Sequence, residues 1–332
     1  MWNRNDVFII AEMSANHNNN FDIAVETINA MALAGADAVK VQTFKPDSLT
    51  LNVDNDFFGP RKDGLWKGKT PYEVFSQGAM PYDWQPKLKE VAENLGMVFF
   101  SSPFDLEGVK FLESINVPLY KIASFEITDI PLIESVAKTG KPIIISTGVA
   151  SISDIELAVN TCRSVGNNDV TLLKCTSEYP ATADMANLLT IPNLKETFDV
   201  KVGVSDHTMG NTIPVVAIAL GARVVEKHFI LDRNLGGPDA AFSMEPPEFK
   251  EMVQACRDAY NSLGKITYTL TERNKLRRRS LFVVEDIEKG ELLTEKNIRS
   301  VRPGNGMPPR YLKELIGKVA PRNYKKGDPF LL

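Results

Sequence analysis

Short apolar runs rich in β-branched residues recur along most of the chain, and segments with helical spacing separate them. The runs are Val7–Met13, Ala38–Thr43, Met97–Pro103, Leu119–Ser124, Pro142–Thr147, Val170–Thr176, Val200–Ser205 and Val224–Phe229. Helical spacing occurs in Phe21–Ala34, Tyr82–Leu95, Pro131–Lys138, Ser153–Val165 and Asn211–Leu220. Near-continuous apolar strands that alternate with helices are typical of a parallel sheet covered on both faces. Eight such units in about 260 residues predict a (β/α)8 barrel.

A doubly wound open sheet is the alternative fold. Such a sheet normally holds phosphate at one glycine-rich turn between a strand and a helix. The sequence contains neither a GxGxxG nor a Walker A pattern. The barrel is therefore the favoured prediction.

The barrel pattern ends near Gly264, which predicts three parts: a barrel at 1–264, a linker at 265–279 and a small domain at 280–332. The run Arg277–Arg279 is typical of a solvated linker face, with domain docking or phosphate steering as the alternative. The last part reads as short strands and turns, with a faint repeat between Ile287–Glu291 and Tyr324–Asp328. A core this small is marginal alone, so we expect it to dock on its own barrel or a partner's.

Composition narrows the functional class. A net charge of −4 and a pI of about 5.6 argue against nucleic-acid binding driven by overall charge. The three cysteines form no CxxC motif and fit a reducing cytoplasm. No apolar stretch is long enough to span a bilayer, and no signal peptide is recognisable. We expect a cytoplasmic protein with neither nucleic acid nor membrane as a partner.

The connection at 44–80 is long and rich in aromatic residues, which are Phe57, Phe58, Trp66, Tyr72 and Phe75. Long loops with this content often form lids or walls that read a substrate. An insertion with its own small core is the alternative. The sequence leaves the two interpretations open.

Polar side chains follow the predicted strands, at the edge where barrel enzymes form their active sites. They are Glu12, Ser14, Asn16, His17, Lys40, Gln42, Ser101, Ser102, Lys121, Ser124, Glu126, Ser146, Thr147, Lys174, Thr176, Ser177, Tyr179, Ser205, Asp206, His207, Glu226 and His228. Charged side chains within apolar strands are costly unless they are paired or used. One or two would fit structural ion pairs, but a set at nearly every strand end predicts a polar active site.

All three histidines, His17, His207 and His228, lie at predicted strand ends. A single histidine is more often a satisfied core residue than a ligand. Two histidines on the adjacent closing strands of a barrel are well placed for one divalent ion. Two imidazoles with oxygen ligands from water and substrate suit Mn²⁺ or a similar ion better than catalytic zinc, which usually has three protein ligands.

Two lysines and several hydroxyls predict an anion site. Lys40 and Lys121 lie at strand ends with the hydroxyls of Ser102, Ser124, Ser146 and Ser205. Together they would cradle a phosphate or carboxylate through charge-assisted hydrogen bonds. Pairing of the lysines with barrel carboxylates is the structural alternative.

Several segments resemble the bacterial sialic acid synthase family, which condenses phosphoenolpyruvate with an acylamino sugar. The segments are Ile9–His17, Gly35–Thr43, Tyr120–Glu126, Cys175–Pro180, Ser205–Thr208 and Val225–Phe229. Val301–Gly306 resembles that family's antifreeze-like (SAF) domain. The resemblance covers essentially the whole chain. It implies a TIM barrel followed by a small β-rich SAF domain.

Within this family, Ser14–His17, Lys45–Leu51 and Gly64–Trp66 look most like the pseudaminic acid branch. That branch condenses phosphoenolpyruvate with 2,4-diacetamido-2,4,6-trideoxy-L-altrose and water, giving pseudaminic acid and phosphate. Gly237–Asp239 instead resembles the sialic acid branch. Synthesis of N-acetylneuraminate or legionaminate, from N-acetylmannosamine or a related sugar, is therefore the alternative. A non-catalytic sugar-binding protein is a third interpretation, against which the strand-end set argues.

The resemblance also implies individual roles. His207 and His228 would hold the metal, which is Mn²⁺ with Mg²⁺ or Co²⁺ as alternatives, and they would join Glu12 and Glu126 as the catalytic residues. Glu12 would be the base that activates water, and Glu126 would lie near the reacting carbons. Phosphoenolpyruvate would contact Lys40, Ser102, Lys121, Ser124, Ser146 and Ser205. The sugar would face Gln42, Tyr179 and Asp239. Arg302 would reach from the SAF domain into the other subunit's barrel and read an N-acetyl group, which implies a domain-swapped homodimer.

Overall fold

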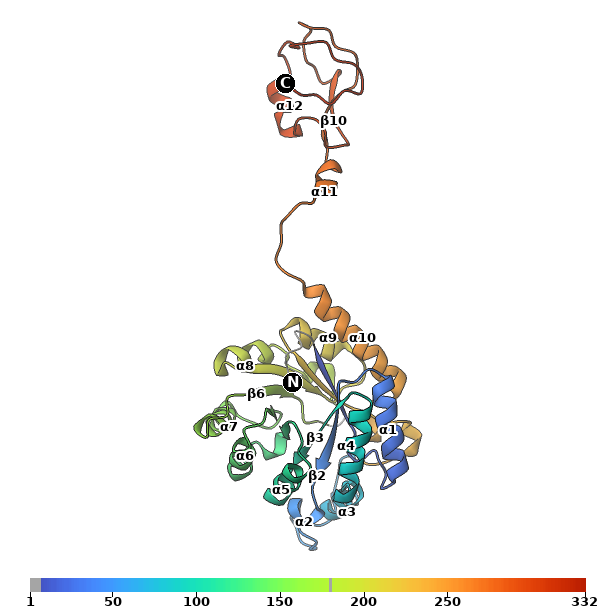
Figure 1. Ribbon diagram of the computed structural model, residues 1–332, viewed down its shortest axis with the longest axis vertical. Coiled ribbons are helices and arrows are strands. Elements are labelled where there is room, and N and C mark those ends of the chain that lie inside the picture. The colour runs from blue at the N-terminus through green and yellow to red at the C-terminus, as the bar shows by residue number, and fades with distance from the viewer. Residues whose placement is uncertain (1–6, 179–180) are drawn as a thin grey trace. The chain divides into compact units, whose positions relative to one another are not determined.

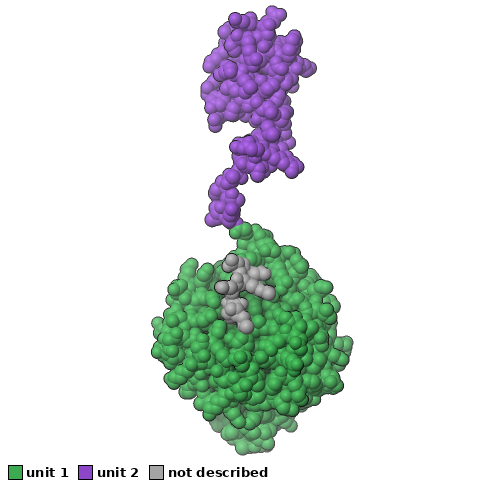
Figure 2. Space-filling model, in the orientation of Figure 1, with its two compact units in different colours: residues 1–264 green, residues 265–332 purple. Residues whose placement is uncertain are grey.

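Two compact units make up the chain, residues 1–264 and residues 265–332 (Figure 2). The structure is a computed structural model, and it describes residues 7–178 and 181–332. The first unit alternates strands and helices, and the second consists mainly of short strands and turns (Figure 1). Within the described residues, no helix is long and apolar enough to cross a membrane.

Eight parallel strands close into a barrel in sequence order, with the last strand paired to the first. They are β1 (Phe8–Glu12), β2 (Ala38–Thr43), β3 (Val98–Pro103), β4 (Tyr120–Ile122), β5 (Ile143–Ser146), β6 (Val170–Cys175), β7 (Lys201–Asp206) and β8 (Val224–His228). Each lies within a predicted apolar run or extends it by a single residue. The closed barrel confirms the predicted fold and excludes the open doubly wound sheet.

One main helix follows each strand. These helices are α1 (Phe21–Leu33), α4 (Gln85–Asn94), α5 (Leu106–Ser114), α6 (Ile130–Ala137), α7 (Ile152–Ser164), α8 (Thr190–Phe198), α9 (Thr212–Ala219) and α10 (Pro246–Leu263). Short helices α2 (Pro46–Leu49) and α3 (Pro71–Gly78) lie between β2 and α4, and the unit's 3₁₀ turns are η1 (Tyr82–Trp84), η2 (Ser124–Glu126), η3 (Ala183–Met185), η4 (Arg233–Leu235) and η5 (Ala240–Phe242). Polar caps fix several helix starts. Asn20 accepts hydrogen bonds from two backbone N–H groups of α1, and Ser151 and Asp154 cap α7 reciprocally.

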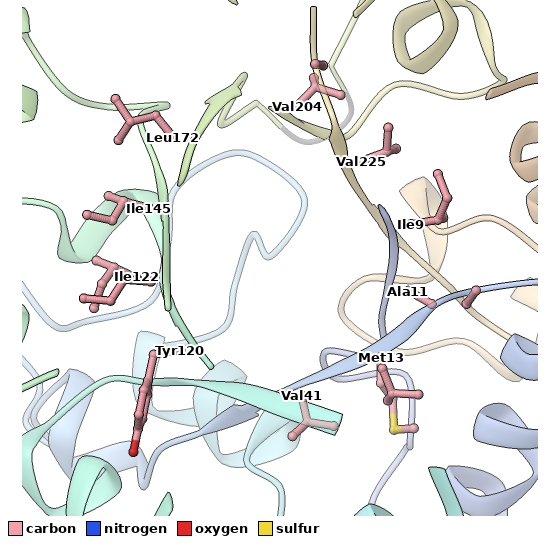
Figure 3. Close-up of a cluster of buried hydrophobic side chains, with 14 of the residues drawn as sticks. Ile9, Ala11, Met13, Val41, Tyr120, Ile122, Ile145, Leu172, Val204 and Val225 are labelled. Carbon is pink, nitrogen blue, oxygen red and sulfur yellow. The ribbon is translucent and has the colours of Figure 1, made fainter. Parts of the chain in front are cut away.

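Alternate strand residues face opposite sides of the barrel wall, which gives the unit two apolar cores. Outward-facing residues such as Ile9, Val41, Ile145 and Val225 belong to a large buried cluster between strands and helices (Figure 3). Inward-facing residues form a smaller cluster: Ile10, Ala38, Phe100, Leu119, Ile144, Leu173 and Val224. This inner cluster fills the middle of the barrel, as in other barrels of this class.

Gly203 of β7 faces this crowded interior. A Cβ atom added there would lie 2.4 Å from the carbonyl oxygen of Val224 and 2.6 Å from Cδ2 of Leu173. The Val224 oxygen belongs to the neighbouring strand's backbone and cannot rotate away. The position therefore requires glycine.

In the second unit, β9 (Ser280–Val283) pairs antiparallel with β10 (Ile298–Val301). Helix α11 (Glu272–Leu276) precedes them, inside the segment predicted as a linker, and η6 (Pro309–Tyr311) and α12 (Leu312–Leu315) follow them. The unit has its own buried core, made by Leu281, Val283, Ile287, Leu293, Ile298, Leu315, Ala320, Tyr324 and Phe330.

The faint sequence repeat corresponds to two equivalent turns in this unit. Ile287 and Tyr324 form an antiparallel bridge, and a tight turn follows each of them. In each turn a carboxylate accepts from a backbone N–H three residues earlier, Glu291 from Glu288 and Asp328 from Lys325. The repeat therefore records a repeated local structure.

Candidate active site

The next inward-facing residue along each strand, after the inner apolar cluster, contributes to a ring of polar side chains. On β1, β2, β4 and β8 the apolar residue is followed two positions later by Glu12, Lys40, Lys121 and Glu226 respectively. On β3, β5, β6 and β7 the corresponding residues are Ser102, Ser146, Cys175 and Ser205. Because side chains alternate along a strand, these residues share the inner face. The inner face thus changes from apolar to polar at the carboxyl ends of the strands, where barrel enzymes place active sites.

A pocket of about 200 Å³ lies at this end of the barrel. Ten of the predicted site residues line it: Glu12, Lys40, Gln42, Lys121, Ser124, Ser146, Ser205, His207, His228 and Asp239. Ser102 is buried on β3 but does not line the pocket, and neither does Glu126 on η2. Arg302 is exposed on the second unit. Tyr179 lies outside the described residues.

The two pocket lysines are paired with carboxylates. Lys40 Nζ lies 2.7 Å from Glu12 Oε2, and Lys121 Nζ lies 3.0 Å from Glu226 Oε1. That Glu226 oxygen also accepts from Ser205 Oγ at 3.0 Å and lies 3.8 Å from Lys40 Nζ. The structural alternative named for the lysines, pairing with barrel carboxylates, is therefore present in the structure.

The two carboxylates have different electrostatic environments. Burial acts to raise the pKa of Glu226, but Lys121 and Lys40 outweigh it and lower that pKa to about 2. For Glu12, burial outweighs Lys40, and the nearby Glu226 adds to it, so the pKa is raised. Gln42 Nε2 donates to Glu12 Oε1 at 2.9 Å and orients the carboxylate. Glu226 is thus a fixed negative charge, whereas Glu12 is the better proton acceptor.

Several buried polar atoms here have no hydrogen-bond partner within residues 7–178 and 181–332. They are Ser102 Oγ, Ser146 Oγ, Glu226 Oε2 and His228 Nδ1. Burying such atoms without partners is costly. Because they gather at one end of the barrel, they indicate that the site is built to take up a polar ligand.

His207 and His228 lie together at the ends of β7 and β8, with ring centroids 5.2 Å apart. His207 Nδ1 donates to the carbonyl oxygen of Thr176 at 2.9 Å, which fixes the ring's orientation as second-shell bonds do for metal ligands. Burial and neighbouring cations lower the pKa of His228, so its imidazole is neutral, the form that binds metals.

The described residues contain no group of three or more His, Cys, Asp or Glu side chains that could hold a metal ion. Two imidazoles with open positions for water and substrate nevertheless fit a divalent ion such as Mn²⁺. His228 Nδ1 supports this fit, because it makes no hydrogen bond to a described residue and lies 3.9 Å from Asp239 Oδ2. His17, by contrast, is buried with its Nε2 3.3 Å from the carbonyl oxygen of Gly78 and its ring edge-on to Trp84, which is a packing role.

The 44–80 connection forms one wall of the pocket. Its residues Phe44, Leu49, Arg61, Trp66, Val74, Phe75 and Gly78 line the cavity, and Phe104 packs against Phe44 with ring centroids 5.3 Å apart. Trp66 Nε1 donates to the carbonyl oxygen of Pro238 at 3.3 Å, which joins this wall to the segment after β8. The structure thus favours the interpretation of this connection as a wall that faces the substrate. Phe57 does not take part in it, because its side chain is exposed and does not line the pocket.

The pocket lining also includes residues to which the sequence assigned no role, among them Glu226, Cys175 and Phe242. Glu226 was noticed only as a polar strand end, and Cys175 and Phe242 were not singled out. Burial acts to raise the pKa of Cys175, but its contact with His207 and the nearby Ser124 and Lys121 lower it to about 7. Strand alternation could have identified Glu226 and Cys175, because each lies two positions after an inward-facing apolar residue, on β8 and β6 respectively.

Comparisons with known proteins show which family the chain belongs to. The NeuB family model matches residues 27–268, and the SAF domain model matches residues 278–332. The pseudaminic acid synthase of Helicobacter pylori is 45% identical, over 97% of this chain and 95% of that protein. The N,N'-diacetyllegionaminic acid synthase of Campylobacter jejuni is 38% identical, over 96% of this chain and 97% of that protein. The crystal structure of N-acetylneuraminic acid synthetase from Leptospira borgpetersenii is 32% identical with a TM-score of 0.72, over 81% of this chain and 89% of that one.

Proposed function

Because the chain belongs to the NeuB family, we propose that it condenses phosphoenolpyruvate with an acylamino sugar and water, releasing phosphate and a nine-carbon acidic sugar. The acceptor we propose is 2,4-diacetamido-2,4,6-trideoxy-L-altrose, and the product is pseudaminic acid. The observation that carries the proposal is the ring of two lysines, two glutamates and three serines on the inner face at the carboxyl ends of the strands. Two histidines lie beside it.

Phosphoenolpyruvate carries a phosphate and a carboxylate, and the ring offers matching donors. Lys40 and Lys121 would meet these anionic groups, together with the hydroxyls of Ser102, Ser124, Ser146 and Ser205. The buried Oγ of Ser146, which lines the pocket and has no hydrogen-bond partner among the described residues, supports this role, because a bound anion would complete its hydrogen bonding. Charge-assisted hydrogen bonds of this kind are stronger than neutral ones.

The reaction follows from these groups. The enol carbon of phosphoenolpyruvate attacks the sugar aldehyde, positive charge develops at the carbon that bears the phosphate, and water adds there. Glu12 would take the proton from that water, since its carboxylate faces the pocket and has a raised pKa. Phosphate then leaves by cleavage of the C–O bond, and the lysines stabilise its charge.

His207 and His228 would hold the divalent ion, with Mn²⁺ as the proposed metal and Mg²⁺ or Co²⁺ as alternatives. When bound, such an ion supplies Lewis-acid polarisation of the aldehyde oxygen. The two rings lie at the same end of the barrel as Lys40 and Lys121 and line the same pocket. The metal ligands and the anion site that we propose would therefore be neighbours.

The acceptor end of the pocket supports a 6-deoxy sugar. Phe44, Phe75 and Phe104 give this wall an apolar surface, which suits a methyl group better than a hydroxylated tail. Gln42 and Asp239 would contact the sugar's polar groups, as would Tyr179. The 45% identity to proteins named pseudaminic acid synthase, against 38% to one named for legionaminic acid, supports the same choice.

We propose that the active enzyme is a cytoplasmic, domain-swapped homodimer in which Arg302 reads an N-acetyl group in the other subunit's pocket. Arg302 is exposed on its own unit, and the three cysteines are free and buried, which suits a reducing compartment. The test mixes two inactive variants, His207→Ala and Arg302→Ala. In a swapped dimer one mixed site contains both wild-type residues, so activity should return on mixing. Two variants that stay inactive when mixed would contradict the swap.

A product assay tests the reaction. Purified protein receives phosphoenolpyruvate and Mn²⁺, with the diacetamido sugar in one sample and N-acetylmannosamine in another. We expect release of phosphate and a nonulosonic acid, identified by mass spectrometry, with the diacetamido sugar. Product only with N-acetylmannosamine would move the assignment to sialic acid synthesis. No product with any acylamino sugar, while Mn²⁺ is bound, would contradict the proposed reaction.

A further inference from the structure

Among the described residues that line the pocket, Arg61 is the cation that has no carboxylate partner. Lys40 and Lys121 each pair with a buried glutamate. The Arg61 guanidinium lines the same pocket but makes no hydrogen bond or ion pair with any residue in 7–178 or 181–332. Its guanidinium carbon lies over the ring of Trp66, 5.1 Å from the ring centroid. A guanidinium stacked in this way keeps its in-plane N–H donors available for a ligand.

The chain around Arg61 holds this side chain in a defined place. The backbone N–H of Arg61 donates to Lys69, and its carbonyl accepts from Gly68, so residues 61–69 form a closed loop. Trp66 ties that loop to Pro238, one residue before Asp239. The partner ring of Arg61 is therefore anchored to the other side of the pocket.

The position of Arg61 relative to the lysines indicates which part of the substrates it would contact. Lys40 and Lys121 are 4% and 2% exposed, so they lie at the bottom of the pocket, whereas Arg61 is exposed at its mouth. This inference rests on the proposed function, in which phosphoenolpyruvate binds at the bottom of the pocket and the acceptor sugar extends toward its mouth. The acceptor carries no charge, and its strongest hydrogen-bond acceptors are the carbonyl oxygens of its acylamino groups.

We infer that Arg61 is a specificity-determining residue, which donates hydrogen bonds to the carbonyl oxygen of the acylamino group farther from the aldehyde, at C4 of the acceptor. The loop 61–69 would thus select sugars with two acylamino groups over those with one. A site that hydrogen-bonds a substrate group rejects analogues that lack it, because its own donors are left unpaired.

The test compares Arg61→Met with Lys62→Met, which removes a charge from an exposed neighbour that does not line the pocket. Each protein is assayed with the diacetamido sugar and with its analogue that has a hydroxyl group at C4. We expect Arg61→Met to lower kcat/KM for the diacetamido sugar by about 10- to 100-fold, as for a hydrogen bond to a charged group. The analogue's kcat/KM and the KM for phosphoenolpyruvate should stay within about threefold, and Lys62→Met should match the wild type in all assays.

The outcomes separate this inference from the proposed function. Equal losses with both sugars, or a raised KM for phosphoenolpyruvate, would overturn the role of Arg61 while leaving the reaction intact. Unchanged kinetics in Arg61→Met would do the same. If the wild type prefers the C4-hydroxyl analogue or uses no acylamino sugar, both the proposed acceptor and this inference fail.

Discussion

Lys121 on β4 and Glu226 on β8 meet inside the barrel, with Nζ 3.0 Å from Oε1 and both side chains buried. The same Glu226 oxygen lies 3.8 Å from Lys40 Nζ. A single carboxylate oxygen therefore interacts with two lysines on different strands, and Lys40 in turn pairs more closely with Glu12, at 2.7 Å. The proposed anionic substrate would add negative charge beside the same two lysines.

Replacing Glu226 with glutamine should strongly destabilise the protein. Breaking a buried pair leaves uncompensated charge, which costs about 3–5 kcal/mol. Urea unfolding should report this loss, and phosphoenolpyruvate should stabilise the variant more than the wild type because its charges replace the missing carboxylate. Glu134→Gln is the matched control, since its pair with Lys138 is exposed and worth less than about 1 kcal/mol. Equal stability of the two variants would contradict this account.

Lys227 should position His207 although it lies outside the pocket. Its Nζ is buried, lies 2.5 Å from Asp206 Oδ2 and also donates to the carbonyl oxygen of Thr208, so it holds both neighbours of His207. We expect Lys227→Met to weaken Mn²⁺ binding about 10- to 100-fold, as happens when a residue that orients a metal ligand is replaced. Titration of Mn²⁺ by electron paramagnetic resonance measures this. The double variant Asp206→Asn with Lys227→Met should regain stability but not Mn²⁺ affinity, and unchanged affinity in the single variant would rule out the positioning role.

Glu126 should make stability depend on pH. Burial raises the pKa of its carboxyl from 4.5 to about 7, so the folded protein holds this proton more tightly than the unfolded chain. The resulting stabilisation is complete below pH 4.5 and is lost as the pH rises through about 7. The free energy of unfolding should therefore fall over this range in the wild type relative to Glu126→Gln. Parallel curves for the two proteins would show that the carboxyl is not perturbed.

Gly203→Ala should destabilise the barrel itself. The added Cβ would meet the backbone of β8 at Val224, and overpacking of this kind costs about 1–3 kcal/mol or more. Because β8 carries Glu226 and His228, the variant should lose Mn²⁺ affinity together with stability. Differential scanning calorimetry and a Mn²⁺ titration test the two effects. A variant as stable as the wild type would mean that β7 and β8 can separate without cost.

The barrel and the bottom of its pocket follow from local sequence patterns. Because side chains alternate along a strand, the pattern alone puts Glu12, Lys40, Lys121 and Glu226 on the inner face of the barrel, independently of the loop conformations. Helices α5, α8 and α10 are not among the segments named for their helical spacing, and α10 begins with two prolines. Their helical form depends on packing against the barrel as much as on their own sequence.

The mouth of the pocket was less predictable. Arg61 and Trp66 reach it because the loop 61–69 is tied to Pro238, a contact between residues 172 positions apart in sequence. Ser102 is on the inner face of β3, as strand alternation predicts, but it does not line the pocket. Glu126 is in the turn η2 and does not line the pocket either. Such placements depend on long-range contacts and loop paths, which spacing does not encode.

Isotope transfer from phosphoenolpyruvate tests the central claim most directly. Phosphoenolpyruvate labelled with ¹⁸O in the oxygen that bridges C2 and phosphorus is incubated with the protein, Mn²⁺ and the diacetamido sugar. Cleavage of the C–O bond predicts that the label leaves in inorganic phosphate, in amounts equal to the nonulosonic acid formed. Label retained in the sugar acid, or phosphate released at the same rate without any sugar, would contradict the condensation proposed for this pocket.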